Sequence, residues 1–186
     1  MLNILEIGAT VFGLIQGLLV MLNKRSNWIA YIVQMIFLVL FSINVKLYGD
    51  VVNNFIYLIL GVIGFILWNK KDNNDIKVCS KREKMIYSGV IAIVTLISYL
   101  VLRTTSDPLP LLDAFTTTSS LVATYYMMIK KIDTWIIWFI NDIFYAIEYF
   151  ILPDQALYLF LLNIVWAVMA VVSYVNWNKI IKEKRI

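Results

Sequence analysis

One short segment concentrates side chains that could bind a flat polar molecule. It reads Trp135-x-x-Trp138-x-x-Asn141-Asp142 and lies in an apolar stretch long enough to cross a bilayer. Tryptophan faces stack on planar rings and attract cations, while amides pair with both donors and acceptors. Because polar groups inside a membrane segment are costly, their presence here indicates a binding function.

The polar side chains of this segment share one face of a helix. At about 100° per residue they fall within a sector of about 140°. The remaining positions are mostly Ile, Phe and Ala, so the opposite face is suited to lipid. We interpret the polar face as the main wall of a substrate-binding site. Its residues are Trp135, Trp138, Asn141, Asp142, Tyr145, Glu148 and Tyr149.

Other apolar stretches carry smaller sets of the same residue types. We include six of them in the predicted site, namely Asn163, Trp166, Gln34, Tyr31, Asn54 and Tyr57. Weaker candidates are Gln16, Ser42, Thr116 to Thr118, Gln155, Tyr158 and Ser173. The amides of Asn163 and Gln34 have an equally good alternative as hydrogen-bonding contacts between helices.

Four tryptophans have a different explanation, because they lie at the expected ends of apolar stretches. They are Trp28, Trp68, Trp135 and Trp177. Aromatic belts at the membrane interface are common at such positions, and we favour a belt for these four, although Trp135 also shares the polar face. Trp138 lies one turn deeper, and Trp166 lies about 16 Å from Trp177 along a helix, too deep for a belt.

The composition is that of an integral membrane protein. The chain has 186 residues, of which 61% are hydrophobic, and its mean hydropathy is +0.80. A soluble domain of this length has too little interior to bury so much apolar surface. Residues 4–22 resemble a signal peptide in hydropathy, but no Lys or Arg precedes them and no small-residue cleavage site follows, so we interpret them as the first span.

Composition and motifs also exclude several kinds of chemistry. The chain has no histidine and one cysteine, Cys79, which we interpret as an ordinary cytosolic thiol in the most charged loop. Histidine catalysis, histidine metal ligation and an intrachain disulfide are therefore excluded. No glycine-rich phosphate loop, nucleophile elbow or metal-ligand pair occurs, so we expect no cofactor and disfavour an intramembrane enzyme. A scaffold or ligand sensor that does not transport remains an alternative.

Apolar runs of roughly 20 residues predict seven transmembrane helices. The side holding the C-terminus carries 14 of the 16 Lys and Arg residues, and the other side only Lys46 and Arg103, so we expect a cytoplasmic C-terminus and an outer N-terminus. This distribution explains the basic pI without a nucleic-acid partner. The polar run Thr116 to Ser120 makes the fifth span the weakest. The spans are 4–22, 27–45, 51–68, 85–102, 111–129, 134–152 and 156–176.

The two halves of the chain match one another in register. At an offset of 107, Glu6, Thr10, Trp28 and Gln34 align with Asp113, Thr117, Trp135 and Asn141. At an offset of 109, Asn54, Tyr57 and Trp68 align with Asn163, Trp166 and Trp177. We predict two parallel three-helix repeats joined by a linker helix, an arrangement typical of one class of transporters. The parts are 1–70, the loop and linker helix 71–107, and 108–186 with a basic tail.

These features resemble the Pnu vitamin-transporter family over nearly the whole chain. The resemblance rests on the Trp-x-x-Trp motif with its amide or acid, on Leu157-Tyr158, and on Trp177 before the basic tail. It implies a fold like that of a full-length SWEET sugar transporter, a homotrimer, and location in a bacterial-type plasma membrane. It also implies facilitated diffusion of an unphosphorylated vitamin or nucleoside, which a cytosolic kinase then traps.

One departure from the family pattern affects the substrate. Members for nicotinamide riboside usually have Trp-x-x-Trp-x-x-x-Asn, whereas here Asn141 comes one residue early and Asp142 holds the expected place. The resemblance makes nicotinamide riboside the first expectation, with deoxynucleosides, thiamine and riboflavin as alternatives. An acid at position 142 suits a cationic ligand, which keeps thiamine among them.

Overall fold

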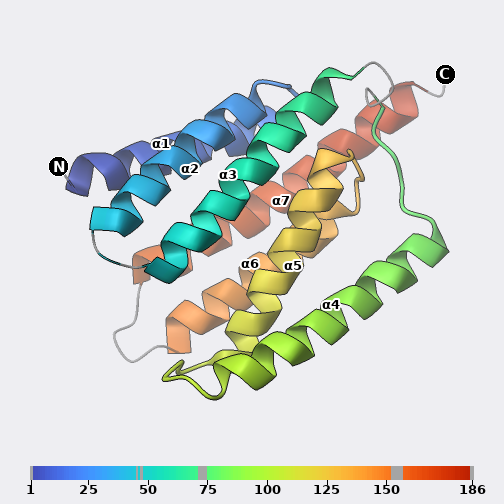
Figure 1. Cartoon of the computed structure of the whole chain (residues 1–186). Helices are drawn as coiled ribbons and strands as arrows, with labels where there is room; N and C mark the ends of the chain where they lie inside the picture. The colour runs from blue at the N-terminus through green and yellow to red at the C-terminus, as the bar shows by residue number, and fades with distance from the viewer. Residues whose placement is uncertain (1, 45, 47, 71–74, 152–156, 185–186) are drawn as a thin grey trace. The chain divides into compact units, whose positions relative to one another are not determined.

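The computed structural model of the chain describes residues 2–44, 46, 48–70, 75–151 and 157–184. Within these ranges the chain forms seven α-helices and no strand (Figure 1). The helices are α1 (Leu2–Met21), α2 (Asn27–Asn44), α3 (Tyr48–Asn69), α4 (Lys81–Leu102), α5 (Pro110–Met128), α6 (Thr134–Ile151) and α7 (Leu157–Glu183).

The seven predicted spans correspond to these seven helices, and two boundaries differ for local reasons. Helix α4 begins at Lys81 because Ser80 and Glu83 form a capping box, in which each side chain accepts a hydrogen bond from the other's backbone amide. Helix α7 continues to Glu183, so the basic segment after Trp177 is helical. The predicted end at 176 followed hydropathy, which does not report where helical hydrogen bonding stops.

Six of the helices in the described residues are long and apolar enough to cross a membrane, and α5 is the exception. The sequence had identified this segment as the weakest span. Its polar side chains are mostly buried, so α5 is suited to packing among other helices and poorly suited to facing lipid. The buried polar residues of α5 are Thr116, Thr118, Ser119, Ser120 and Thr124.

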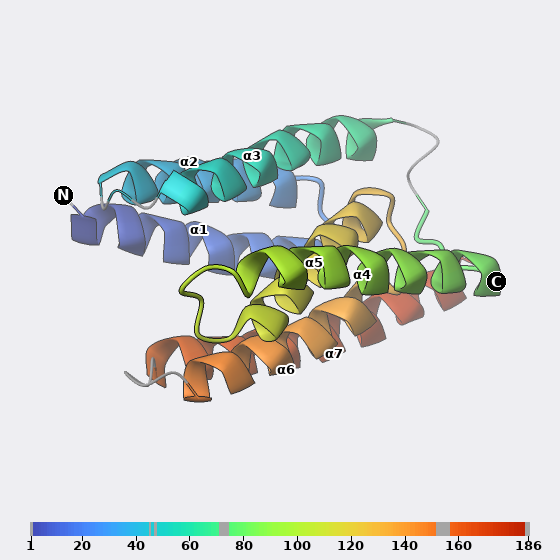
Figure 2. The same cartoon turned by 60° about the horizontal axis from the view of Figure 1, so that its bottom comes forward.

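The helices group into two compact units, residues 1–75 and 76–186. In the first unit α2 packs against both α1 and α3. In the second unit α4, α5, α6 and α7 pack in chain order, each against the next (Figure 2). Helix α4, which we expected to link the two repeats, packs on α5 and belongs to the second unit. The boundary between the two units follows Asp75, within the predicted linker segment 71–107.

The turns that precede α2 and α6 have the same local structure. Asn23 and Lys130, which the offset of 107 aligns, both adopt a left-handed backbone with φ of 52° and 54°. Such a conformation is uncommon outside glycine, so its recurrence at matched positions is informative. The hydrogen bonds match as well, running from Lys24 N to Leu19 O (2.9 Å) and from Lys131 N to Tyr126 O (2.8 Å).

The four tryptophans expected in an aromatic belt are instead buried in two matching pairs. Trp28 and Trp68 meet edge to face with ring centroids 5.9 Å apart, and Trp135 and Trp177 do so at 5.3 Å. The belt prediction was wrong because position near a helix end does not determine where an indole points. The first pair joins α2 to α3 and the second joins α6 to α7, and edge-to-face geometry is favourable for such rings.

Small residues make room for these aromatic rings. A Cβ added at Gly64 of α3 would lie 2.5 Å from the Trp28 ring, so only glycine fits there. The aligned position on α7 is Ser173, also small and buried. Gly61 lies similarly against Tyr31, with a Cβ at 2.8 Å, and its counterpart is the buried Ala170. Small residues at both positions let the neighbouring helices approach closely in both units.

The segment before α4 is fastened to the turn between α5 and α6, a contact that we call the linker clamp. Lys77 pairs with this turn through two backbone hydrogen bonds, from its amide to Lys130 O (2.8 Å) and from Ile132 N to its carbonyl (2.9 Å). Asp133 accepts a hydrogen bond from Cys79 N at 2.7 Å and pairs with the Lys84 ammonium at 2.7 Å. A second ion pair joins Lys131 to Glu83 at 2.8 Å.

The linker clamp also changes the chemistry of the only cysteine. Cys79 was expected to be an ordinary thiol, but it is buried, and burial raises the pKa of its thiol to about 11. Burial also works to raise the pKa of Asp133, but Lys84 and the Cys79 amide outweigh it and hold that pKa below its usual value. The stabilisation by Asp133 is therefore present at neutral pH and is lost as the pH falls through its lowered pKa.

Replacing Gly64 tests the packing of the tryptophan pair. We expect Gly64→Ala to lower the stability by about 1–3 kcal/mol, because the buried Trp28 ring must shift to admit the methyl group. Gly89→Ala on α4 is a matched control, since its Cβ would meet nothing within 4 Å, and we expect it to be neutral or slightly stabilising. Thermal unfolding in detergent compares the two, and equal melting temperatures would contradict the packing.

Alkylation of Cys79 tests the linker clamp. We expect Asp133→Ala to speed maleimide labelling roughly tenfold, because losing these bonds makes local opening easier by about 1–3 kcal/mol. Glu183→Gln is the control, because it removes only an exposed pair with Lys179. The chain has one cysteine, so mass spectrometry reads a single site. A labelling rate unchanged by Asp133→Ala would show that the clamp does not protect the thiol.

Candidate functional site

Helix α6 separates its polar and apolar side chains as the sequence predicts. Four of its apolar residues, Ile136, Phe139, Ile140 and Ile147, are each at least 40% exposed. None of the seven candidate residues on the helix is exposed. Trp135, Asn141 and Asp142 are buried, and Trp138, Tyr145, Glu148 and Tyr149 are half-buried.

Asn141 contacts α5 through its side chain. It is fully buried, and its Oδ1 accepts a hydrogen bond of 2.6 Å from the Ser119 hydroxyl. Its Nδ2 is buried without a hydrogen-bond partner within the described residues. Because an unpaired buried donor costs free energy, this amide can offer one strong hydrogen bond to a bound molecule.

Asp142 is the other buried polar group at the centre of α6. Its exposed fraction is 6%, and among the described residues no hydrogen bond or ion pair reaches its carboxylate. Trp138 precedes it by four residues and Tyr145 follows by three, so both share its side of the helix. This combination of a carboxylate and aromatic rings is suited to a flat ligand with positive charge.

The later turns of α6 carry aromatic rings and a second acid. Tyr145 and Tyr149 stack with ring centroids 6.2 Å apart and an interplanar angle of 16°. Glu148 is half-buried, and its Oε2 has no hydrogen-bond partner in the described part of the chain. Its electrostatic neighbours, Asp107 and Asp113, are also acids. This end of the helix therefore lies near two further acidic residues.

Several candidates in the first unit are directed to neighbouring helices. Asn54 of α3 donates a hydrogen bond of 3.2 Å to the Ser42 hydroxyl of α2. Gln34 packs on α1, where its Nε2 lies 2.6 Å from the place of a Cβ on Gly13. Tyr31 is buried edge to face with Trp28 at 5.6 Å. These contacts support a structural role for the amides, the alternative that the sequence left open for Gln34.

For the remaining candidate residues the structure gives the burial of the side chain or leaves the side chain undescribed. Tyr57 of α3 and Asn163 and Trp166 of α7 are half-buried, each within its own unit. Gln155 lies outside the described residues, and the side chain of Tyr158 does too. The structure brings Trp135 and Trp177 together directly, and it joins the α6 face to α5 through Asn141.

Sequence reasoning missed one residue of α5 that contacts this face, Ser119, and one unpaired polar residue of the same helix, Thr124. Ser119 supplies the partner of Asn141, and Thr124 has a buried hydroxyl without a hydrogen-bond partner among the described residues. Polar residues at 116, 120 and 124 recur every four positions, which predicts one helix face, and Ser119 lies beside them. This periodicity was a signal that the polar run packs against a neighbouring helix.

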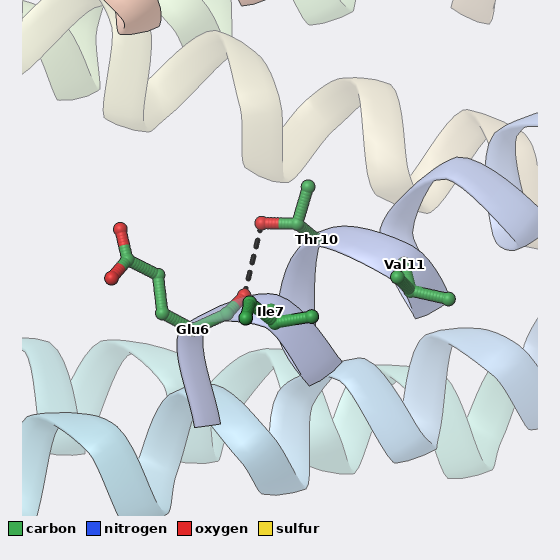
Figure 3. Close-up of a pocket in the computed structure, with 4 residues that line it drawn as sticks. All are labelled: Glu6, Ile7, Thr10 and Val11. Carbon is green, nitrogen blue, oxygen red and sulfur yellow. Dashed lines mark hydrogen bonds between the residues drawn. The ribbon is translucent and has the colours of Figure 1, made fainter. Parts of the chain in front are cut away.

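A shallow depression of about 480 Å³ lies on α1 and is lined by Glu6, Ile7, Thr10 and Val11 (Figure 3). All four come from one helix, and Thr10 donates a hydrogen bond of 2.9 Å back to the Glu6 carbonyl oxygen. The aligned Thr117 donates to the Asp113 carboxylate at 3.3 Å. These bonds support a structural role for the two threonines and for Asp113, and all the residues that line the depression come from α1.

The described residues contain no group of three or more Cys, Asp or Glu side chains that could hold a metal ion. The polar groups that remain available on α6 and α5 are an amide donor, a carboxylate, hydroxyls and aromatic faces. Such groups can bind and orient a small organic molecule by stacking and hydrogen bonding.

An all-helical bundle with six membrane-capable helices and a buried polar helix face defines a multi-pass membrane protein. The family described as "Nicotinamide mononucleotide transporter" matches residues 3–179, and the chain belongs to this family of membrane transporters. A relative is the nicotinamide riboside transporter PnuC of Neisseria mucosa, 24% identical over 189 residues, covering 94% of this chain and 72% of the relative.

A solved structure has the same fold. The crystal structure of the vitamin B3 transporter PnuC superposes with a TM-score of 0.75 at 23% identity, covering 96% of this chain and 82% of the other. The resemblance to Pnu-type transporters and the all-helical membrane architecture are therefore confirmed. Because the family consists of transporters, an intramembrane enzyme is excluded.

Removing the Ser119 hydroxyl tests the link between α5 and α6. We expect Ser119→Ala to lower the stability by about 1–2 kcal/mol, since it leaves the buried Asn141 amide with neither oxygen nor nitrogen paired. Ser173→Ala is the control, because that buried hydroxyl bonds to Met169 O of its own helix. Chemical denaturation in detergent compares the variants. Equal losses for both would show that the interhelical bond contributes little.

Proposed function

We propose that this chain carries an unphosphorylated vitamin or nucleoside across the membrane, with nicotinamide riboside as the first candidate. The observation that carries the proposal is the α6 face, where buried Asn141 and Asp142 lie among half-buried aromatic rings. The relative from Neisseria mucosa is a nicotinamide riboside transporter, and its match extends along nearly the whole chain. An aromatic ring and sugar hydroxyls suit stacking faces and an amide donor.

The distribution of positive charge favours the riboside over its phosphorylated form. The family description refers to the mononucleotide, whose phosphate would require Arg or Lys partners. Helices α5 and α6 contain no Lys or Arg, and those of α7 are Lys179 and Lys182 in its last two turns. A phosphate beside the α6 face would therefore lack its usual partner and would meet Asp142.

For the mechanism, we infer that two parallel three-helix repeats joined by α4 expose the site alternately to each side. The matching turns before α2 and α6 and the matching tryptophan pairs support such a repeat. Transport is facilitated diffusion, and a cytosolic kinase traps the product inside the cell. The N-terminus lies outside, the C-terminus is cytoplasmic, the fold of each chain is SWEET-like, and the assembly is a homotrimer.

A second substrate deserves a test because of Asp142. Thiamine also carries a permanent positive charge on an aromatic ring, which a buried carboxylate would stabilise. Deoxynucleosides and riboflavin have flat rings without this charge, so the α6 face supports them less well. A membrane ligand sensor would bind such molecules without moving them, and an uptake measurement separates it from a transporter.

Uptake into proteoliposomes tests the proposed function. We expect saturable uptake of labelled nicotinamide riboside and no competition from the mononucleotide. We expect a loss of about tenfold or more in Trp138→Ala, because stacking on one base contributes about 1–3 kcal/mol. Asn163→Ala should lose about tenfold, because it removes an amide that can hydrogen-bond to the ligand. Phe139→Ala is the control, since this residue is 40% exposed on the apolar face of α6. Full uptake in Trp138→Ala and Asn163→Ala would refute the site.

The same vesicles separate facilitated diffusion from active transport. Without a kinase we expect the internal concentration to level off at the external one, and with an enclosed riboside kinase and ATP we expect label to accumulate as the phosphorylated product. Accumulation of unmodified riboside against a gradient would contradict facilitated diffusion. Binding without any uptake would instead identify a sensor.

A further inference from the structure

The turns before α2 and α6 share a backbone conformation but differ in charge at one position. Asn23 and Lys130 adopt the same left-handed φ in the two turns, 52° and 54°. Three residues further on, the offset of 107 aligns Ser26 with Asp133. Ser26 is exposed and uncharged, whereas Asp133 is buried. Only the second turn therefore carries an acid at this position, although the repeat gives both turns the same geometry.

Asp133 holds the segment before α4 through both of its carboxylate oxygens. Its Oδ2 accepts a hydrogen bond of 2.7 Å from Cys79 N, and its Oδ1 lies 2.7 Å from Lys84 Nζ. The Asp133 side chain is 8% exposed, so the loss of a partner would leave a buried charge poorly compensated. Just before Cys79, Lys77 pairs with the same turn through two backbone hydrogen bonds. The attachments of the linker clamp therefore follow one another closely along the chain.

Helix α4 has one neighbouring helix in its unit. It packs on α5 and on no other helix of the second unit, and Thr95 is the only residue of α4 that is buried. Near the linker clamp, Tyr87 of α4 meets Tyr126 of α5 edge to face with ring centroids 4.9 Å apart, and Tyr126 packs against Cys79. Because lipid provides no hydrophobic driving force between helices, such specific contacts determine which helices stay together.

We propose that the linker clamp stays closed throughout transport and fixes α4 to the second repeat, so that α4 to α7 move as one body. The inference rests on the alternating exposure proposed above and specifies which helices move together. Rigid-body motion requires contacts that persist in both end states, and a buried ion pair is costly to break. Because Ser26 occupies the position of Asp133 in the first repeat, that repeat has no matching acid for a clamp of its own. Helix α4 therefore belongs to the repeat that follows it.

A disulfide across the linker clamp tests whether the clamp stays closed. Lys77 and Lys131 lie opposite each other in a parallel bridge, a placement that a disulfide can join. The variant combines Lys77→Cys and Lys131→Cys with Cys79→Ala, which removes the native thiol but keeps the amide that donates to Asp133. In proteoliposomes we expect uptake of nicotinamide riboside to differ by less than about twofold between the oxidised and the reduced protein. The two single-cysteine variants control for effects of the oxidant.

Rescue by the same disulfide tests what the linker clamp contributes to transport. In the reduced protein we expect an added Asp133→Ala to lower the maximal uptake rate about threefold or more and to leave the half-saturating concentration unchanged. Oxidation should restore the rate, because the covalent bond replaces the lost contacts. Equal amounts of monodisperse protein are reconstituted, so a loss of folded protein does not enter the rate. Glu183→Gln is the control, because it removes only an exposed pair with Lys179.

The outcomes separate this inference from the proposed function. If the wild type carries no nicotinamide riboside, the proposed function is wrong, and hydrogen exchange of the Lys77 and Ile132 amides then decides the inference. Exchange as slow as in the middle of α6 supports a closed clamp, and fast exchange overturns it.

If the wild type transports but oxidation of the double-cysteine variant abolishes uptake, the linker clamp opens during transport and the inference is wrong. Failure of the disulfide to form would also contradict a closed clamp. If Asp133→Ala leaves the rate unchanged, or if oxidation does not restore it, the clamp does not control how α4 moves. If Asp133→Ala does not fold, the comparison of oxidised and reduced protein without this substitution decides.

Discussion

The close packing of α2 on α3 and of α6 on α7 is the constraint on which the rest of each unit depends. Trp28 of α2 meets Trp68 edge to face, and Trp135 of α6 meets Trp177 in the same way. Gly64 beside Trp28 allows the close approach of α3 to α2 in the first unit. In an apolar solvent, helices associate through such packing because lipid provides no hydrophobic driving force. The polar face of α6 keeps its orientation because this packing fixes the rotation of the helix.

Helix α5 shows how the second unit keeps a polar helix among membrane-capable ones. Its hydroxyl side chains are buried, and several bond to carbonyl oxygens of the preceding turn, as Thr116 does to Leu112 O at 3.0 Å. Such bonds reduce the cost of placing hydroxyls in an apolar environment. Ser119 differs because its hydroxyl also reaches Asn141 across the helix interface. Most of the polar run is thus satisfied locally, and Thr124 is the α5 residue whose buried hydroxyl has no hydrogen-bond partner among the described residues.

Much of the fold could be predicted from the sequence because bilayer thickness and backbone hydrogen bonding leave few solutions for long apolar runs. The sequence also predicted the inward face of α6, since a 3.6-residue period separates polar from apolar positions without tertiary information. It could not predict where Trp28 and Trp68 point, because a belt and a buried pair require the same residues near a helix end. The contacts of the linker clamp could not be predicted either, because their partners, such as Cys79 and Asp133, are far apart in the chain.

The amide and acid on α6 illustrate why residue type alone does not assign a role. Both are polar groups within an apolar helix, and the sequence placed them together in one recognition face. The structure separates them, because Ser119 holds Asn141 against α5 while no cation from α5 or α6 reaches Asp142. The Asn141 oxygen contributes to packing whether or not a ligand is present, whereas a buried carboxylate without a counter-ion is stabilised when positive charge arrives. That difference makes the acid the residue whose free energy depends most on the ligand.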